Sequence, residues 1–540
     1  MTETSATSGR NPFVAILLGV TAIGVAALGL RFRSYYMDDA FTGFRYVANL
    51  LGGDGFVFNP GERVEGVTNA GWLLLLAPFA AALGPALAAK LLGAALLAAV
   101  VLLTAATATR LVGAGAHPAI PLAAGLLVLS RFDVAYFSLA GMETGLIAGL
   151  LLFGLWLSHA DRRPYLAAGV SAVAYAVRPE AVLVYPVAIA IGLTTGAVTA
   201  RAALPRLAAF AAAVAAIAGA RYLYFGELVP NTFFAKTGDI GGAVAALFLG
   251  GDGPSVNVPF PFAGPFVLLP LGLGLYAAHR RSPRAAAYAA AVVATGYLFA
   301  YYAEPDWTGL GRYFAPYLPV GVCLLLAGGA WLEGMLPRRA GDDMRPAFAE
   351  AKPLRLRAGR RGRVTLAVAA AIVAVGAIDI LYQSSPSRLR SFPGYVMAGE
   401  ALVEPARWMR ANLPADALIA TRRIGAAAFV GDKRVFDYSL GLTDRAVARR
   451  VRAAGKRFWS PADPGLADLW RDRRPDYLLE DSDVIDAIVA ETGGSRDLFR
   501  LHGVPYRVVR SFPIGRRAEE TLFGRRDTEI AWTLAAAVRE

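Results

Sequence analysis

The sequence has few residues that could cross-link the chain or hold a metal cluster. It contains one cysteine, Cys323, and four histidines among its 540 residues. A single cysteine excludes an intrachain disulfide and any cysteine-based metal cluster. The histidines, at positions 117, 159, 279 and 502, show no metal-ligand spacing. The C-terminal part also lacks a P-loop and a GxGxxG motif after a strand, so it has no nucleotide-binding fingerprint.

Long apolar runs are abundant. Hydrophobic residues make up 56% of the chain, and runs of about 17 to 23 residues, long enough to cross a bilayer as helices, recur along the first 382 positions. The predicted fold is therefore a polytopic α-helical membrane protein. The run at 70–83 is too short to cross and is predicted to be a re-entrant or interfacial helix. About eleven transmembrane helices are expected, at residues 12–30, 87–109, 118–136, 144–160, 165–177, 181–198, 207–225, 263–280, 285–302, 314–335 and 363–382.

The positive charge of the chain indicates its orientation. A net charge of +13 would suggest nucleic-acid binding in a soluble protein, but here the basic residues fall in alternate loops between the apolar runs. Those loops are predicted to be cytoplasmic. The intervening loops and everything after Tyr382 then lie on the extracytoplasmic side. We expect a bacterial inner-membrane protein with no nucleic-acid partner.

The composition changes after the last apolar run. Charged residues become more frequent and the apolar runs shorten. Strand-like pieces at 417–421, 434–438, 477–479 and 506–509 alternate with helical patterns at 400–412 and 446–454. The sequence therefore predicts two parts, a transmembrane module at 1–385 and an extracytoplasmic soluble α/β domain at 386–540. Within the first part, residues 31–86 form the first outward loop with its interfacial helices.

Two adjacent acids, Asp38 and Asp39, follow the first apolar run directly. Burying two carboxylates at the mouth of a membrane span costs too much desolvation for a packing role. We therefore predict that they face water or a polar cavity and form the centre of an active site. The alternative is that they cap the helix expected at 41–51 and complement its dipole, and both roles can hold at once.

The other outward loops also carry residues able to do chemistry. Arg178, Lys236 and Arg312 are predicted to bind a phosphate, which the forked geometry of arginine suits well. Alternatively, Arg178 ends a helix and snorkels, and Lys236 anchors at the headgroups. A carboxylate base and phosphate-binding cations facing away from the cytoplasm suit group transfer from a lipid-linked phosphate donor. The predicted substrate-binding residues are Glu65, Asn69, Glu143, Glu180, Glu227, Asn231, Asp306, Trp307 and Tyr313.

A series of motifs in order along the chain carries a resemblance to a known family. They read Asp-Asp-Ala-Phe at 38–41, FNPGERVEGVTN at 58–69, GMET at 141–144, RPE at 178–180, GELVPNTFFAK at 226–236, RYFAPYLP at 312–319 and VFDYSLGLTD at 435–444. In this respect the chain resembles the GT-C membrane glycosyltransferases that use polyprenyl-phosphate sugars. The subgroup with these motifs includes terminal arabinofuranosyltransferases of mycobacterial cell walls. Met142 replaces the leucine of that subgroup's GLET turn.

The resemblance implies a GT-C fold and an inverting glycosyltransferase. It also implies that Asp38 is the general base with Asp39 in support, and that the partners are a polyprenyl-phosphate sugar donor, a glycan or glycolipid acceptor and the lipid bilayer. Arabinofuranose is one candidate sugar. No cofactor is certain, because some members use a divalent metal and others none. The alternative function is a transporter or flippase for a lipid-linked saccharide, although the sequence shows neither repeated halves nor charges in mid-span.

Overall fold

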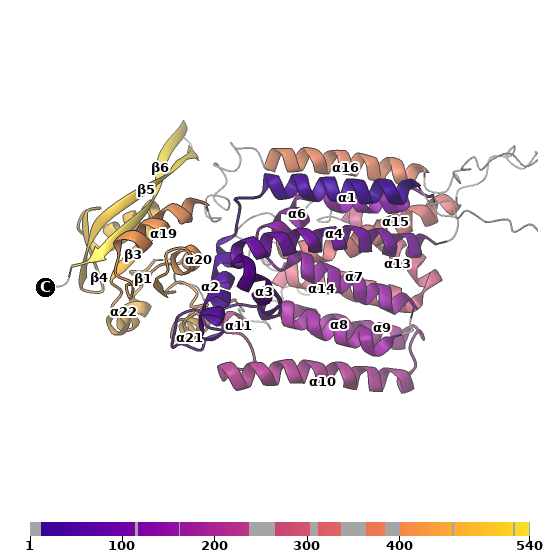
Figure 1. Ribbon diagram of the computed structural model, residues 1–540, viewed down its shortest axis with the longest axis horizontal. Helices are drawn as coiled ribbons and strands as arrows, with labels where there is room; N and C mark the ends of the chain where they lie inside the picture. The colour runs from indigo at the N-terminus through magenta and orange to yellow at the C-terminus, as the bar shows by residue number, and fades with distance from the viewer. Residues whose placement is uncertain are drawn as a thin grey trace, which may run out of the picture.

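The computed structural model is a bundle of helices that carries a mixed α/β domain at one end (Figure 1). It describes residues 12–113, 117–160, 163–236, 265–302, 311–335, 363–383, 400–455, 458, 460–521 and 524–538. The elements of the bundle are α1 (Pro12–Arg31), α3 (Ala70–Leu83), α4 (Pro85–Val112), α5 (Ile120–Leu129), α6 (Phe132–Leu139), α7 (Thr144–Ala160), α8 (Pro164–Val177), η1 (Pro179–Leu183), α9 (Val184–Thr194), α10 (Ala200–Phe225), α13 (Pro265–Arg281), α14 (Pro283–Tyr302), η2 (Ala315–Tyr317), α15 (Leu318–Met335) and α16 (Arg363–Gln383).

The bundle has the character of a multi-pass membrane protein. Within the described residues, five helices are long and apolar enough to cross a membrane, namely α1, α4, α10, the η2–α15 segment and α16. The bent pair α5–α6 makes a sixth if it counts as one span. Large apolar side chains such as Ile23, Leu223 and Leu381 are more than two thirds exposed, as expected of a lipid-facing surface. The predicted number of eleven spans stays a prediction, because α3, α7, α8 and η1–α9 are shorter apolar helices.

The single helix predicted over 118–136 is divided in two. α5 ends at Leu129 and α6 begins at Phe132, with a bend of 64° between them. At the break the guanidinium of Arg131 contacts the Asp133 carboxylate at 2.8 Å, and Asp133 also accepts a hydrogen bond from the Val134 amide. The two charged side chains within this apolar run thus satisfy each other at a helix start, which explains why the helix does not continue.

The C-terminal part folds around a six-stranded sheet with the order β2-β1-β3-β6-β5-β4. β1 (Leu418–Ala420), β2 (Arg434–Phe436) and β3 (Tyr477–Asp481) are parallel, and β4 (Leu498–Leu501), β5 (Val504–Thr521) and β6 (Gly524–Ala537) continue the sheet in antiparallel pairs. Its helices are α19 (Glu400–Asn412), α20 (Ile424–Phe429), α21 (Arg445–Ala454), η3 (Pro464–Leu466), α22 (Ala467–Arg473) and α23 (Ser482–Thr492).

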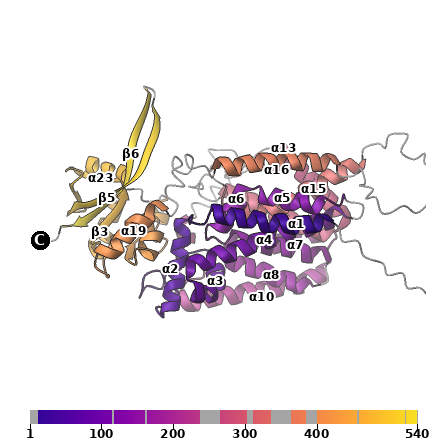
Figure 2. The ribbon, with the colours of Figure 1, turned by 45° about the horizontal axis from the view of Figure 1, so that its top comes forward.

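The strands and helices predicted for this part are confirmed, but the sequence did not predict β4, β6, α20, η3, α22 or α23. β6 is rich in alanine, which favours strands weakly, so its pairing with β3 and β5 decides its conformation. The β5–β6 hairpin extends beyond the rest of the sheet (Figure 2).

The two parts meet at α2 (Asp38–Gly52), which lies between the bundle and the sheet domain in both views (Figures 1 and 2). The ring of Phe429 from α20 stacks on Phe41 at 5.9 Å and meets Phe44 edge-on at 5.5 Å. One continuous cluster of buried apolar residues runs from the bundle through this contact into α19, β1 and β3. The sheet domain therefore shares a hydrophobic core with the bundle.

Candidate functional site

Asp38 lies at the first position of α2, beneath α20 of the C-terminal domain. Its carboxylate accepts hydrogen bonds from the backbone amides of Gly425 at 3.0 Å and Ala426 at 2.8 Å. The residue is only 4% exposed. Burial raises the pKa of Asp38 to about 6, although the two amide bonds act in the opposite direction. In this arrangement both carboxylate oxygens are engaged by the C-terminal domain.

Asp39, the next residue, has a different environment. Its carboxylate forms an ion pair with the guanidinium of Arg312, which lies just before η2 and is distant in sequence. The Asp39 side chain is 31% exposed, whereas that of Arg312 is 9% exposed. The structure thus brings together the predicted acid of the first loop and one of the predicted phosphate-binding cations.

Arg178 sits at the end of α8 and holds two predicted substrate-binding acids. Its guanidinium bonds the carboxylates of Glu143 at 2.9 Å and Glu180 at 2.7 Å. The Asn69 amide donates a further hydrogen bond to Glu143 at 2.8 Å. Burial raises the pKa of Glu143, but the Arg178 and Arg312 guanidinium groups outweigh it and hold this pKa below its usual value. Glu143 is therefore ionised and electrostatically linked to both arginines.

An aromatic ring lies close to both arginines. Tyr313 is buried, and its ring centroid lies 6.0 Å from the Arg178 guanidinium carbon and 5.8 Å from that of Arg312. Phe299 of α14 packs edge-on against Tyr313 and lies 5.1 Å from Arg178. Two predicted cations and one predicted substrate-binding residue are thus neighbours, as a common site requires.

Glu65 is placed by an arginine that the sequence analysis did not select. Its carboxylate contacts the guanidinium of Arg221 from α10 at 2.6 Å, and Tyr175 accepts a second bond from Arg221 at 2.7 Å. All three side chains are largely buried. Arg221 lies in the last turns of α10, which also holds Arg201 and Arg206 near its start, and an ionisable residue close to a span end was the signal that could have identified it.

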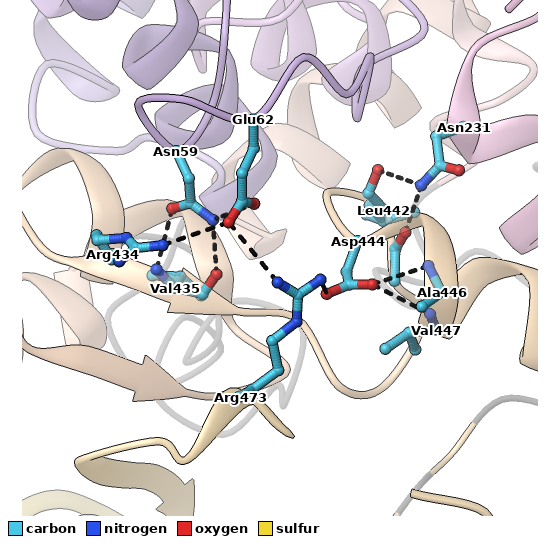
Figure 3. A network of polar contacts seen from close by, with 11 residues as sticks. Asn59, Glu62, Asn231, Arg434, Val435, Leu442, Asp444, Ala446, Val447 and Arg473 are labelled. Carbon is cyan, nitrogen blue, oxygen red and sulfur yellow. Dashed lines mark hydrogen bonds and ion pairs between the residues drawn. The ribbon is translucent and has the colours of Figure 1, made fainter. Parts of the chain in front are cut away.

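Asn231, a predicted substrate-binding residue, lies instead at the contact with the C-terminal domain (Figure 3). At the start of α11 (Asn231–Lys236), its amide donates to the carbonyls of Gly441 at 2.6 Å and Leu442 at 2.9 Å. Asn59, from the FNPGERVEG loop, exchanges two bonds with the backbone of Val435. The loop motifs of the bundle therefore dock onto the VFDYSLGLTD motif of the sheet domain.

Charged side chains surround this docking contact. Glu62 of the same loop lies 3.4 Å from Arg434 and 3.9 Å from Arg473, and Arg473 bonds Asp444 at 2.8 Å (Figure 3). Asp444 also caps α21, accepting from the amides of Ala446 and Val447.

Glu227 is the remaining predicted site residue whose side chain the structure describes, and it does not join this cluster. Glu227 forms an exposed pair with Arg449 at 3.5 Å. Asp306 and Trp307 lie outside the described residues, as does the side chain of Lys236 at the end of α11. A cavity that includes Arg206 and Arg284 in its lining lies at the opposite end of the bundle. A polar cavity beside Asp38 and Asp39 stays a prediction.

Among the residues that the structure describes, no group of three or more His, Cys, Asp or Glu side chains is placed to hold a metal ion. Asp38 is engaged by amides and Asp39 by Arg312, so the predicted acid pair does not form a ligand set with a third described donor. We therefore derive no chemical step through a metal.

Fold and site together define a multi-pass membrane protein with carboxylates and guanidinium groups gathered at the end of the bundle that carries a second domain. The chain is 30% identical over 394 residues to the terminal beta-(1->2)-arabinofuranosyltransferase of Mycobacterium tuberculosis strain H37Rv. The match covers 68% of this chain and 56% of the relative, so the chain spans little more than half of the relative's length. The predicted resemblance to this subgroup is confirmed.

Two solved proteins share the fold. ArnT from Cupriavidus metallidurans in the apo state aligns with a TM-score of 0.53 and 13% identity over 98% of each chain. Its structure bound to undecaprenyl phosphate also gives a TM-score of 0.53 at 13% identity, over 97% of this chain and 98% of that one. The archaeal oligosaccharyltransferase AglB from Archaeoglobus fulgidus, in complex with an inhibitory peptide and a dolichol-phosphate, aligns with a TM-score of 0.51 and 11% identity over 88% of this chain and 70% of its own.

A family model also matches the C-terminal part. Residues 395–531 fit a family described as a domain of unknown function, DUF8728. This range includes α20 and five of the six strands in full, together with most of β6.

Proposed function

We propose that this protein is an inverting glycosyltransferase that moves a sugar from a polyprenyl-phosphate donor to a cell-envelope glycan or lipid. The observation that carries the proposal is the Asp39–Arg312 ion pair, which joins a partly exposed carboxylate to a guanidinium close to Arg178. Such a pair supplies the two things that transfer from a sugar phosphate needs, a proton acceptor and a phosphate-binding cation.

The roles of the two acids follow from their surroundings. The resemblance assigns the base to Asp38, but with α20 in place Asp38 is buried and both of its oxygens accept amide hydrogen bonds. Asp39 keeps about a third of its side chain exposed. We therefore assign proton acceptance to Asp39, and we treat Asp38 as a buried neighbour that positions the first turn of α2.

The reaction balances with these groups alone. The acceptor hydroxyl oxygen attacks the anomeric carbon of the donor sugar from the side opposite the phosphate, and its proton passes to Asp39. The bond between the anomeric carbon and the phosphate oxygen breaks, and the polyprenyl phosphate leaves with both bonding electrons. Arg312 and Arg178 offset the negative charge that builds up on the departing phosphate. The product has the inverted configuration.

The compared proteins support the donor class. The Mycobacterium tuberculosis relative is named for transfer of arabinofuranose, and the structures of ArnT and AglB hold undecaprenyl phosphate and a dolichol-phosphate. Arabinofuranose is therefore the first sugar to test. We further propose that the chain lies in a bacterial inner membrane, with a transmembrane module at 1–385. The acids and a soluble domain at 386–540 would then be extracytoplasmic.

The test is transfer by the purified full chain from a panel of labelled polyprenyl-phosphate sugars to a glycan acceptor. Asp39→Asn should slow transfer about 100-fold or more, the range expected for loss of a general base. Asp54→Asn is the matched control, because Asp54 is exposed and belongs to the same loop. Movement of the labelled donor across proteoliposomes without transfer would favour the flippase alternative. Normal transfer by Asp39→Asn would remove Asp39 from the role of base.

A further inference from the structure

The C-terminal domain reaches the predicted acid pair directly. Gly425 and Ala426 of α20 lie 387 and 388 residues after Asp38 in sequence, yet their amides donate to its two carboxylate oxygens. We propose that this domain completes the catalytic centre, with α20 and Arg422 positioning Asp38 and, through it, Asp39. The proposal rests on the proposed function for its catalytic meaning, but the contact itself can be tested without any substrate.

Gly425 is the residue that permits this approach. A Cβ placed on it would overlap the carbonyl oxygen of Asp38 and lie 2.9 Å from Asp38 Oδ1. The obstacle is partly backbone, which cannot turn aside as a flexible side chain would. Any side chain at position 425 therefore pushes α20 away from the carboxylate.

The turn that precedes α20 is held by a buried charge network. Arg422 forms ion pairs with Glu480 at 2.9 Å and with Asp481, and its backbone amide also donates to Glu480. Tyr438 donates a further bond to Glu480 at 2.8 Å. Glu480 is fully buried and sits on β3, in the middle of the sheet. The turn is thus anchored to the rigid part of the domain, as precise positioning of a carboxylate requires.

Docking contacts hold the whole domain in register with α2. Arg45 of α2 bonds Asp432 at 2.6 Å, and Asn59 exchanges two bonds with the backbone of Val435. Asn231 holds the carbonyls of Gly441 and Leu442 from another part of the bundle (Figure 3). These contacts come from separate segments, so they fix the orientation of the domain as well as its attachment.

The arrangement gives a role to a domain whose family is described only as of unknown function. Held by two amides, Asp38 fixes the first turn of α2, and Asp39 is the next residue of that turn. A shift of about 1 Å in a reacting group lowers catalytic rates by about 100-fold. Displacing α20 should therefore lower the turnover rate much more than it changes donor affinity.

The first experiment measures hydrogen–deuterium exchange of the full chain in detergent, without substrate. In Asp38→Asn the amides of Gly425 and Ala426 lose their charged acceptor, so exchange in peptides covering residues 422–430 should become on the order of tenfold faster. Asp39→Asn serves as the matched control, since α20 makes these bonds to Asp38. Unchanged exchange in Asp38→Asn would overturn the contact.

The second experiment compares transfer by Gly425→Ala and Gly465→Ala. At Gly465, in the same domain, a Cβ would meet only side-chain atoms at 3.1 Å or more, so this variant controls for a generic glycine effect. We expect Gly425→Ala to lower kcat about 10- to 100-fold with little change in the KM for the donor. If Gly425→Ala does not fold, Ala426→Pro replaces it, because proline is tolerated in a first helical turn and removes one of the two donors.

The outcomes separate the two proposals. Faster exchange at α20 in Gly425→Ala together with an unchanged kcat would overturn the positioning role. If the wild-type chain transfers no sugar from any donor, the proposed function fails, while the exchange experiment still decides whether α20 holds Asp38.

Discussion

At the scale of single residues, two neighbouring carboxylates differ sharply in environment. Asp38 is buried and held by backbone amides, whereas Asp39 is partly exposed and held by a guanidinium. Hydrogen bonds from amides stabilise the ionised form of a buried acid but leave its pKa above the ordinary value here. The pair thus combines one buried, fixed group with one group that keeps about a third of its side chain exposed.

The raised pKa of Asp38, about 6, predicts an acid limb in the transfer rate. Asp38 gains a proton as the pH falls through about 6, whereas an ordinary aspartate stays ionised to about 4. Protonation weakens the amide bonds that seat α20, so transfer should decline over that range. Asp39 raises this pKa and Arg423 lowers it, so both contribute to the midpoint.

The measurement is kcat/KM against pH for the wild type and for the residual activity of Asp38→Asn. The limb near pH 6 should disappear in the variant, which has no proton to gain. A wild-type limb at about pH 4, or an unchanged limb in Asp38→Asn, would contradict the assignment.

Arg178 should matter for stability as well as for donor binding. It is buried between Glu143 and Glu180, and Arg178→Met leaves both acids without their main partner. Breaking a buried ion pair from one side costs about 3–5 kcal/mol of unfolding free energy. The free energy of unfolding, measured by denaturant titration of the detergent-solubilised protein, should show this loss. Glu227→Gln, which breaks an exposed pair with Arg449, is the control and should change stability little.

At the scale of elements, the loop motifs act mainly as docking surfaces. The side chains of Asn59 and Asn231 form hydrogen bonds with the backbone of the VFDYSLGLTD motif in the C-terminal domain. Asn59 bonds Val435 at the start of the motif, and Asn231 bonds the carbonyls of Gly441 and Leu442. A polar side chain that bonds backbone groups fixes the position of its own segment relative to the partner segment, because backbone donors and acceptors are regularly spaced. Motifs from distant parts of the sequence are thus complementary halves of one interface.

Gly66 provides a test of this interface. A Cβ at Gly66 would lie 2.8 Å from the carbonyl oxygen of Leu442, 2.7 Å from Thr443 Cγ2 and 2.9 Å from Tyr46 Oη. Gly66→Ala should therefore loosen the domain and speed hydrogen exchange across residues 438–446. Gly29→Ala, where a Cβ meets nothing within 4 Å, is the control. Equal exchange in the two variants would show that the contact is not tight.

At the scale of the whole molecule, one apolar core continues from the bundle into the sheet domain past Phe41, Phe44 and Phe429, and the sheet domain has a second core of its own. The acids and their arginine partners lie at that junction, and the cavity lined in part by Arg206 and Arg284 lies at the far end. The two ends should therefore face opposite sides of the membrane, as the distribution of positive charge predicts.

Cysteine labelling tests this orientation cleanly, because the one natural cysteine is buried. Arg201→Cys places an exposed thiol at the start of α10, and Asp497→Cys places one in the sheet domain. In intact spheroplasts a membrane-impermeant maleimide should label Asp497→Cys and reach Arg201→Cys only after permeabilisation. The reverse pattern would invert the proposed topology.

Much of the architecture was predictable because it follows from local pattern. Apolar runs predicted the helices of the bundle, and the change in composition after Tyr382 predicted strands and helices that the structure contains. The sequence also selected Asp39, Arg312, Arg178 and Glu143, which the structure brings together. These residues could be selected because they are ionisable and lie at the ends of predicted spans. Ionisable groups at membrane depth are costly, so they usually have a function.

What the sequence alone determined was the membrane-spanning class of the chain and the candidate acids and arginines apart from Arg221, because hydrophobicity and charge are local properties. Only the tertiary structure decided which acid is covered. The bonds from Gly425 and Ala426 to Asp38 join positions almost four hundred residues apart. No periodic pattern in the sequence predicts that contact. It arises because two folded surfaces fit together and a glycine leaves room for a carboxylate.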